Sequence, residues 1–244
     1  MNARVALTRE NPGLAVIRLT AAAPTAEFAA ELAGICQEIN FDTAIRAAVI
    51  TGSGPAFCRD VASGRKIPAA FSLAGPVASL NCPVIAAING NAIGLGLELA
   101  LACDIRIAAK TALFSFPGIW HGLTPSDGAS QRLPRLVGQA KAIELMLTGE
   151  KITAAEALRI GLVSRVVPTK GVLDVALEMG GEMSGKASMA LRYCKEAVYK
   201  GLDMTLAQGL QLEGDLYFLL HTTEDRAEGI TAFKEKRRPK FKGK

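Results

Sequence analysis

The sequence predicts an α/β fold with a mainly parallel sheet and a helical C-terminal third. Short apolar runs of strand type recur along the first part of the chain, and helical segments separate several of them. Strands that alternate with helices favour crossover connections and therefore parallel pairing. After Asp127 the pattern changes to one helix after another. With 244 residues, of which 50% are hydrophobic, the chain can bury the core of one domain with a small helical appendage.

The individual elements follow from apolar spacing and from turn and cap signals. Apolar runs at 5–7 and 14–19, on either side of Asn11-Pro12-Gly13, predict a β-hairpin. Thr25 suits the N-cap of a helix that runs to about residue 40, because apolar residues recur there at helical spacing. Further strands are expected at 47–50, 84–88, 104–108, 112–114 and 162–167, and further helices at 127–136, 138–148, 153–160, 171–183, 187–200 and in one long segment from about 204.

Composition excludes several classes of protein. No uninterrupted apolar run reaches the roughly 18 residues of a membrane-spanning helix, so we expect no membrane partner. The first residues lack the apolar core of a secretory signal, and the five scattered cysteines indicate buried thiols in a reducing compartment. We therefore expect a cytoplasmic protein. His121 and His221 are the only histidines, and CxxC and HExxH spacings are absent, so we expect no metal site.

The net charge of +5 is concentrated in the tail, where residues 234–244 read KEKRRPKFKGK. One interpretation is a solvated, mobile terminus. The other is phosphate binding, because clustered cations beside an aromatic residue such as Phe241 can hold a nucleotide. A nucleic-acid partner is not expected, since the rest of the chain shows no further basic or aromatic patch.

The segment 83–104 carries the strongest indication of chemistry. It reads as a buried strand, a glycine-rich turn and a helix that begins near Gly94. The first N–H groups of a helix have no partner within it, and they lie at the positive end of its dipole. Such donors suit an oxygen that becomes negative during a reaction. Glu98 lies three residues after Leu95, so we expect its carboxylate on the same face as the Leu95 N–H.

Glu98 is the only charged residue between Lys66 and Asp104. A buried carboxylate is costly, so a functional role with a raised pKa is one interpretation. The other is structural: the glycines pack the helix tightly, and Glu98 is a helix-start charge that the dipole favours. A dinucleotide-binding loop is excluded, because Leu99 stands where GxGxxG needs its third glycine.

Several motifs occur together in the order that one family shows. They are AAVITGSGPAFC (47–58), PVIAAINGNAIGLGLELALACDIRIAA (83–109), SQRLPRLVG (130–138), AIELMLTGEKITAAEALRIGLVSRVVP (142–168) and TEDRAEGITAFKEKRRPKFKGK (223–244). On these motifs the chain resembles the enoyl-CoA hydratase/isomerase (crotonase) superfamily over nearly its whole length. The resemblance implies a crotonase-like ββα spiral core at 1–190 and a helical C-terminal trimerisation region with a basic tail at 191–244.

The resemblance also implies the ligand and the assembly. The substrate is expected to be an acyl-CoA thioester whose carbonyl oxygen is held by two main-chain N–H groups. No metal or redox cofactor is expected, and coenzyme A enters as part of the substrate. The protein is expected to be a homotrimer or a hexamer made of two trimers.

The second of the two oxyanion donors falls on Leu95, where most relatives have glycine. For the first donor, relatives usually read F-C-A-G-A-D, whereas this chain reads FCRDVAS. An alignment without a gap places the donor at Val61, and a two-residue deletion places it at Arg59; we slightly favour Val61. The following Arg65 and Lys66 are either CoA phosphate contacts or a solvated pair. The residues expected to contact substrate or CoA are Arg59, Asp60, Ala62, Gly94, Gly118, Lys240 and Phe241.

Glu98 matches one of the two glutamates with which hydratases of this family handle water. The other normally follows the proline of Q-P-E or F-P-E, where this chain has Gly118. We expect this loss to slow hydration, because an acid/base group commonly contributes about 10²- to 10⁴-fold. His121 is either an accessory group or a packed surface residue. Asp127 is either an accessory group or the cap of the helix that begins at Gly128.

The resemblance therefore implies an acyl-CoA enzyme, with enoyl-CoA hydratase as the leading interpretation. Another reaction of the superfamily is the first alternative: isomerisation, decarboxylation or C–C bond cleavage with Glu98 as the proton carrier. A non-catalytic scaffold that binds CoA esters is the second alternative.

Overall fold

The computed structural model describes residues 3–11, 13–21, 23–60 and 71–244. Its strands form two sheets, one with the order β1-β2-β3-β5-β7-β10 and a smaller one with the order β4-β6-β8-β9. The strands are β1 (Val5–Asn11), β2 (Leu14–Leu19), β3 (Ala47–Gly52), β4 (Ala56–Cys58), β5 (Val84–Ile88), β6 (Asn91–Ile93), β7 (Ile105–Ala109), β8 (Leu113–Ser115), β9 (Ile152–Thr153) and β10 (Arg165–Val167).

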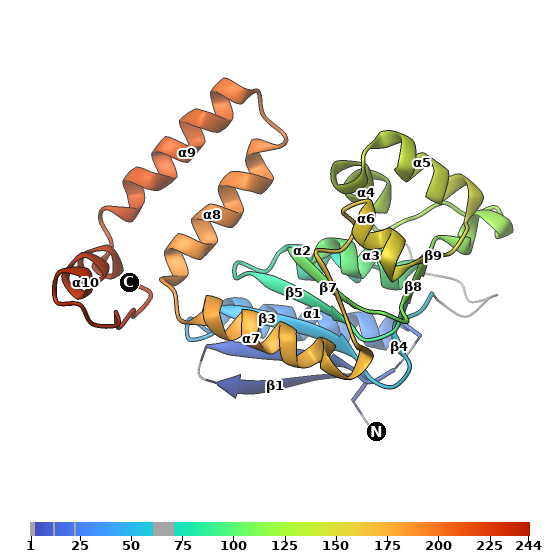
Figure 1. Ribbon diagram of the computed structural model, residues 1–244, viewed down its shortest axis with the longest axis horizontal. Helices are drawn as coiled ribbons and strands as arrows, with labels where there is room; N and C mark the ends of the chain where they lie inside the picture. The colour runs from blue at the N-terminus through green and yellow to red at the C-terminus, as the bar shows by residue number, and fades with distance from the viewer. Residues whose placement is uncertain (1–2, 12, 22, 61–70) are drawn as a thin grey trace.

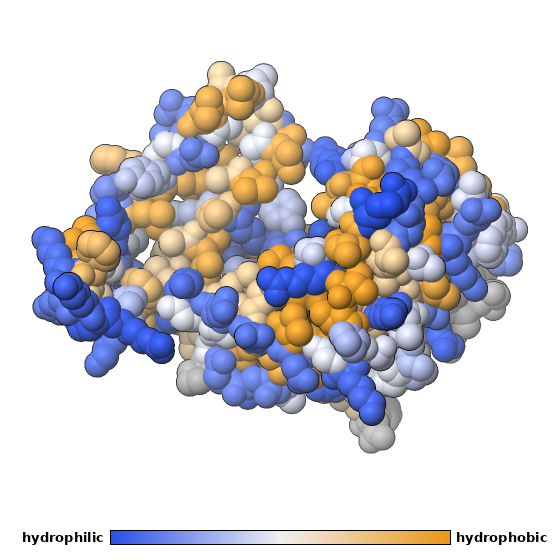
Figure 2. Space-filling model, viewed as in Figure 1, coloured by the Kyte–Doolittle hydropathy of each residue, from blue (hydrophilic) through white to orange (hydrophobic). Residues whose placement is uncertain are grey.

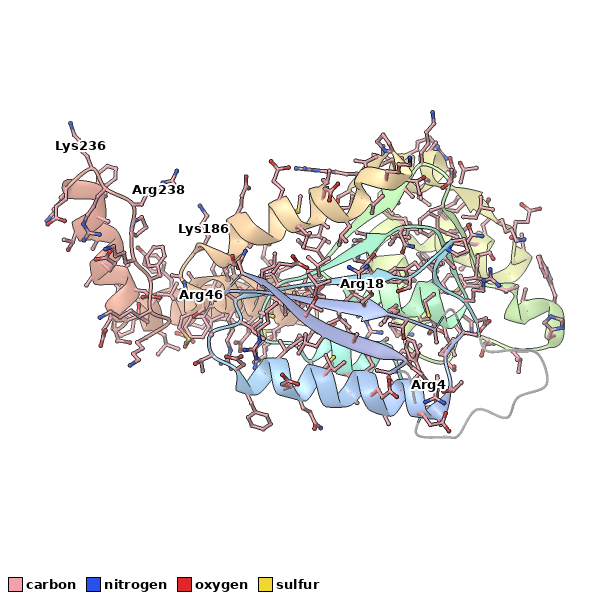
Figure 3. All side chains as sticks on the ribbon, turned by 90° about the horizontal axis from the view of Figure 1, so that it is seen from below. Arg4, Arg18, Arg46, Lys186, Lys236 and Arg238 are labelled. Carbon is pink, nitrogen blue, oxygen red and sulfur yellow. The ribbon has the colours of Figure 1, made fainter. Side chains whose placement is uncertain are left out.

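The large sheet is mainly parallel, as the sequence predicts. Strands β2, β3, β5, β7 and β10 pair in parallel, and only β1 pairs antiparallel, in the hairpin with β2. Every residue of β3 and β5 is buried, as is usual for strands covered on both faces. Figures 1 and 3 show the covering helices, with α1 (Ala26–Phe41) on one face and α7 (Val172–Ser184) on the other.

The small sheet arises because three long strands each lead into a short one. The chain passes from β3 to β4, from β5 to β6 and from β7 to β8. The short strands β4, β6 and β8 pair in parallel, and β9 adds an antiparallel edge. Repetition of long strand, short strand and helix produces a spiral of ββα units. The α/β class predicted from the sequence is confirmed.

Helices cover the sheets and make up the C-terminal third. α8 (Ser188–Gly201) and α9 (Leu206–Leu220) extend from the body as an antiparallel pair, and α10 (Glu224–Lys234) lies near their base (Figure 1). The remaining helical segments are α2 (Ala74–Ala78), α3 (Leu95–Ala102), η1 (Pro117–His121), α4 (Ala129–Val137), α5 (Gln139–Thr148), α6 (Ala154–Arg159) and η2 (Thr169–Gly171).

The C-terminal helices carry exposed apolar side chains. Leu206, Phe218 and Phe233 are 79%, 71% and 86% exposed, respectively. Figure 2 shows apolar surface along α8 and α9. The predicted division between residues 190 and 191 falls within α8, and it stays a prediction.

The long helix expected from about 204 is α9, which begins at Leu206. It ends at Leu220, and Thr223 caps a further helix, α10, by accepting the Arg226 N–H. One expected element is corrected. The strand expected at 162–167 is shorter and begins at Arg165. The N–H groups of Leu162 and Val163 instead donate to the Ala157 carbonyl and close the end of α6.

The buried thiols that the composition indicates are present at four of the five cysteines. Cys36, Cys58, Cys82 and Cys103 are buried, Cys194 is exposed, and all five are free thiols. Across the described ranges, no helix combines the length and the apolar character needed to cross a membrane.

Candidate active site

Helix α3 begins directly after a glycine with a backbone conformation that other residues rarely adopt. Gly94 has φ +55° and ψ −120° and is the N-cap of α3. Its N–H donates to the Ser115 carbonyl on β8, and its carbonyl accepts the N–H groups of Leu97 and Glu98. The turn therefore fixes the start of α3 against the small sheet.

The segment after β4 packs against the first turn of α3. A Cβ atom at Gly96 would overlap the Cys58 carbonyl, so only glycine permits this approach. The Leu95 N–H, the predicted oxyanion donor, lies 3.5 Å from Oδ1 of Asp60. A negatively charged oxygen thus stands beside the amide that we expected to hold a carbonyl oxygen.

Glu98 is buried, as predicted, and three main-chain donors hold its carboxylate. Only 2% of the residue is exposed. Oε1 accepts the Ser126 N–H at 3.2 Å, and Oε2 accepts the N–H groups of Asp127 at 2.7 Å and of Ala129 at 3.1 Å. These donors lie at the start of α4, where the helix dipole also favours negative charge. The carboxylate is therefore fixed in one orientation.

Burial raises the pKa of Glu98, because removal from water penalises the charged form. The three N–H donors and the neighbouring Asp127 act in opposite directions, the donors lowering the pKa and Asp127 raising it. A carboxyl group with a raised pKa keeps its proton to a higher pH than an exposed one. The pKa of Glu98 is therefore shifted in the direction that suits a group that exchanges a proton during a reaction.

Asp127 does not cap α4, which corrects one of the two interpretations above. The N-cap of α4 is Gly128, and no side chain caps it there. The Asp127 carboxylate instead accepts hydrogen bonds at the start of α2, from Ser72 Oγ at 2.6 Å and from the N–H groups of Leu73 and Ala74, each at 2.7 Å. Asp127 therefore joins α2 to the loop that holds Glu98.

The place of the second family glutamate lies in η1. The three atoms nearest to a Cβ atom at Gly118 all belong to Leu123 and lie 3.4 Å or more away, so the backbone there has room for a Cβ atom. His121 is exposed at the end of η1. Trp120 is 58% exposed and donates from Nε1 to the Thr148 carbonyl at 2.8 Å. The accessory role of His121 stays a prediction.

The first oxyanion donor remains open between its two candidates. Arg59 is exposed and Asp60 is partly exposed at the end of the segment that approaches α3. Val61 and Ala62, together with Arg65 and Lys66, lie outside the described residues.

The basic tail is folded back onto α10. The Asp225 carboxylate accepts the N–H groups of Lys242 and Gly243, and Glu228 accepts that of Lys240. Arg46 donates to the Phe241 carbonyl at 2.7 Å. Figure 3 shows the side chains of Lys236 and Arg238 projecting from the surface at this end of the molecule. Within one chain, α10 and its tail lie far from α3 (Figure 1), so Lys240 and Phe241 do not join Leu95 and Glu98.

Among the described residues, histidine, cysteine, aspartate and glutamate side chains form no group of three or more that could hold a metal ion. The site that the structure assembles is a helix start whose Leu95 N–H faces the Asp60 carboxylate, with the buried carboxylate of Glu98 one turn later. A main-chain N–H donor and a buried carboxylate are the kinds of group with which enzymes stabilise an oxyanion and transfer a proton.

Comparison with known proteins gives the family. Residues 9–244 match the family model described as enoyl-CoA hydratase/isomerase. The putative enoyl-CoA hydratase/isomerase YngF of Bacillus subtilis is 40% identical, with all of both chains covered. The 2,3-dehydroadipyl-CoA hydratase of Escherichia coli is 38% identical over 94% of this chain and 96% of its own length. The crystal structure of enoyl-CoA hydratase from Bacillus anthracis superimposes with a TM-score of 0.95 at 36% identity, covering 99% of this chain and 100% of the other.

The chain belongs to the enoyl-CoA hydratase/isomerase family and is an enzyme of that family. Its fold is the crotonase-like ββα spiral that the sequence predicts.

Proposed function

We propose that the enzyme adds water to a 2-enoyl-CoA thioester, or eliminates it from the 3-hydroxyacyl-CoA product. The Leu95 N–H and a second main-chain N–H, from Val61 or Arg59, hold the thioester carbonyl oxygen. The observation that best supports this is the placement of the Leu95 amide and the buried Glu98 on one turn of α3. Amide donors aimed at a developing oxyanion stabilise it strongly, because they need no reorganisation.

Each proton in the proposed reaction has a donor and an acceptor. Glu98 takes a proton from water as the water oxygen bonds to Cβ of the enoyl group. The electron pair of the Cα–Cβ double bond moves toward the carbonyl, and an enolate forms in the amide cradle. Glu98 then returns its proton to Cα, the thioester carbonyl reforms, and the carboxylate is regenerated. One carboxylate thus performs both transfers, and the raised pKa of Glu98 suits a group that alternates between acid and base.

Gly118 favours a second candidate, the isomerisation of a 3-enoyl-CoA to a 2-enoyl-CoA. This reaction needs no water, so it does not suffer from the loss of a second water-positioning glutamate. Glu98 removes a proton from C2, and the enolate in the cradle relays the electron pair. The proton then returns at C4. The same cradle and the same carboxylate serve both reactions, and only the substrate distinguishes them.

The proposed assembly is a homotrimer or a hexamer. The exposed apolar residues of α8, α9 and α10 support it, because soluble proteins rarely leave extended apolar surface uncovered. In such an assembly Lys240 and Phe241 contact the CoA nucleotide of a neighbouring subunit, which fits their distance from α3 in one chain. We propose that no cofactor takes part beyond the coenzyme A of the substrate.

The test is steady-state hydration of crotonyl-CoA by the wild-type protein and by Glu98→Gln and Glu98→Asp. We expect kcat to fall by about 10²- to 10⁴-fold in Glu98→Gln, since the variant has no group to accept the proton of water. The exposed Glu150→Gln is the matched control and should retain full activity. Circular dichroism confirms that each variant is folded.

The outcomes separate the candidates. Rapid hydration that survives Glu98→Gln would show that Glu98 does not carry the proton. Slow hydration together with fast conversion of a 3-enoyl-CoA would select the isomerase. Binding of acyl-CoA esters without turnover, across 2-enoyl and 3-enoyl substrates, would contradict both candidate reactions.

A further inference from the structure

The carboxylate of Asp60 is seated on the start of α3. A Cβ atom at Gly94 would overlap Oδ2 and Cγ of Asp60, so the carboxylate lies directly over the Gly94 backbone. Its other oxygen, Oδ1, lies 3.5 Å from the Leu95 nitrogen. Two separate observations therefore place both oxygens of Asp60 against the same peptide unit. Only glycine suits position 94, because φ is positive there and because a Cβ atom would collide with the Asp60 carboxylate.

This contact differs from ordinary helix capping. A capping residue precedes its helix directly and satisfies a donor that has no other use. Gly94 is the residue in that position, and no side chain caps α3 from there. Asp60 reaches the helix from a segment 35 positions earlier in the chain. The donor it approaches is the one that the proposed reaction needs.

The length of this contact indicates that a ligand can displace the Asp60 carboxylate from the Leu95 N–H. A good N–H···O bond to a carboxylate is about 2.7–2.9 Å long, so a separation of 3.5 Å gives up much of the attraction. A thioester carbonyl can form the shorter bond. An enolate oxygen and a carboxylate oxygen cannot share one amide without strong repulsion at short range.

We propose that Asp60 is an internal competitor for the carbonyl cradle, which a thioester carbonyl must displace in order to bind. This inference rests on the proposed function, because it takes the Leu95 amide as the oxyanion donor. Asp60 thereby weakens the binding of every ligand that places a carbonyl in the cradle, and it leaves unchanged the binding of ligands that lack one. It is a specificity-determining residue and carries no step of the proton transfer.

The test measures the affinity of two probes that differ only at the carbonyl. Butyryl-CoA has the thioester C=O, and S-butyl-CoA has a CH₂ group in its place. Isothermal titration compares the wild-type protein with Asp60→Asn, which removes the charge, and with Asp60→Ala, which empties the seat. Asp174→Asn is the matched control, because it removes one negative charge at an exposed site on α7.

We expect Asp60→Asn to bind butyryl-CoA several-fold more tightly, and Asp60→Ala about tenfold or more. S-butyl-CoA should bind all four proteins equally within about twofold, because it never enters the competition. A gain for both probes would assign the effect to net charge and overturn the proposal. Weaker binding of both probes would mean that Asp60 supports the structure of the site. An unchanged affinity for butyryl-CoA would mean that Asp60 does not compete for the Leu95 N–H. Either result also overturns the proposal.

The same experiment keeps this inference separate from the proposed function. If the wild-type protein turns over crotonyl-CoA while the Asp60 variants gain no affinity for butyryl-CoA, only the competitor role fails. If no variant distinguishes butyryl-CoA from S-butyl-CoA and none shows turnover, the carbonyl cradle itself fails, and both proposals fall together.

Discussion

The main-chain N–H of Asp127 donates to Oε2 of Glu98 at 2.7 Å, while the Asp127 carboxylate binds the start of α2. One residue thus links the buried carboxylate of the candidate active site to a helix more than 50 positions earlier in the chain. The loop 126–129 is held from both sides, by Glu98 on α3 and by the first turn of α2. Fixing a catalytic group in this way reduces the cost of orienting it for reaction.

The first prediction concerns this link. Asp127→Ala removes the acceptor of three hydrogen bonds and leaves the donors at the start of α2 unpaired. We expect the free energy of unfolding to fall by about 1–3 kcal/mol. We also expect kcat to fall, because the loop that holds Glu98 loses its second anchor. Urea denaturation and hydration kinetics measure the two effects.

The control for Asp127 is Asp203→Ala, which breaks an exposed ion pair with Arg135. The Asp203 side chain is 69% exposed, so its loss should cost less than about 1 kcal/mol. Equal stability losses in the two variants would contradict the anchoring role of Asp127.

The second prediction concerns the missing glutamate. Gly118→Glu restores a carboxyl group where the backbone has room for a Cβ atom, since the nearest atoms to its Cβ lie 3.4 Å away. We expect the variant to fold and to hydrate crotonyl-CoA at least about tenfold faster, because a second acid/base group can share the handling of water. Gly118→Gln provides the shape without the charge and should show no gain. If the Gly118→Glu protein is folded but hydrates crotonyl-CoA at the wild-type rate, a carboxyl group at residue 118 does not take part in the reaction.

The third prediction concerns the turn before α3. Gly94→Ala forces an L-residue into φ +55° and pushes a methyl group against Asp60. We expect a loss of at least about 2 kcal/mol in stability, because the strain and the overlap add together. Gly34→Ala in α1 is the opposite case, since a Cβ there meets no atom within 4 Å. It should stabilise the protein by about 0.5–1 kcal/mol. Similar melting temperatures for the two variants would refute this account of the turn.

The fourth prediction concerns pH. Burial raises the pKa of Glu98 in the folded protein above that of the unfolded chain. The folded state therefore holds the Glu98 proton more tightly, and the stability that this contributes disappears as the pH rises through the folded pKa. Relative to Glu98→Gln, the wild-type protein should lose stability as the pH rises above the ordinary carboxyl value of about 4.3 and through the raised pKa of Glu98. Denaturant titrations at several pH values measure the unfolding free energies of both proteins. A wild-type protein that gains stability relative to Glu98→Gln as the pH rises would contradict the prediction.

The same shift has a kinetic consequence. If Glu98 acts first as a base, kcat/KM for hydration falls at low pH with an apparent pKa above the ordinary carboxyl value of about 4.3. An acid limb at or below that value would mean that another group controls the rate.

The sequence predicts those features whose causes lie close together in the chain. Thr25 is the N-cap of α1, and its side chain accepts the Phe28 N–H, as its position before an apolar helix indicates. The glycine-rich turn before a helix start near Gly94 is also present, with Gly94 as the N-cap of α3. Glu98, the one charge in a long apolar segment, is buried with a raised pKa. Each of these follows from a pattern within a few residues.

Features that depend on contacts between distant parts of the chain cannot be predicted from local sequence patterns. Asp127 looks like a local helix cap, and only the folded chain brings α2 to its carboxylate. The three donors to Glu98 also come from a loop about 30 residues away. The folded-back tail depends on Asp225, which is 3% exposed, and no pattern in the basic segment points to that residue.

Short elements are missed for a different reason. β4, β6 and β9 have two or three residues each, too few for any periodicity to appear. The break between α9 and α10 did have a signal, because Thr223 precedes two acidic residues in the manner of a helix start. The apolar spacing on both sides of it hides that signal.

The most direct test of the carbonyl cradle is isotope-edited infrared difference spectroscopy of bound butyryl-CoA, labelled at the carbonyl carbon. The saturated ligand cannot react, so its C=O stretch reports only the hydrogen bonds that it receives. We expect the stretch of the bound thioester to lie at lower frequency than in water, because preorganised amides polarise the bond. A stretch at or above its frequency in water would contradict the cradle.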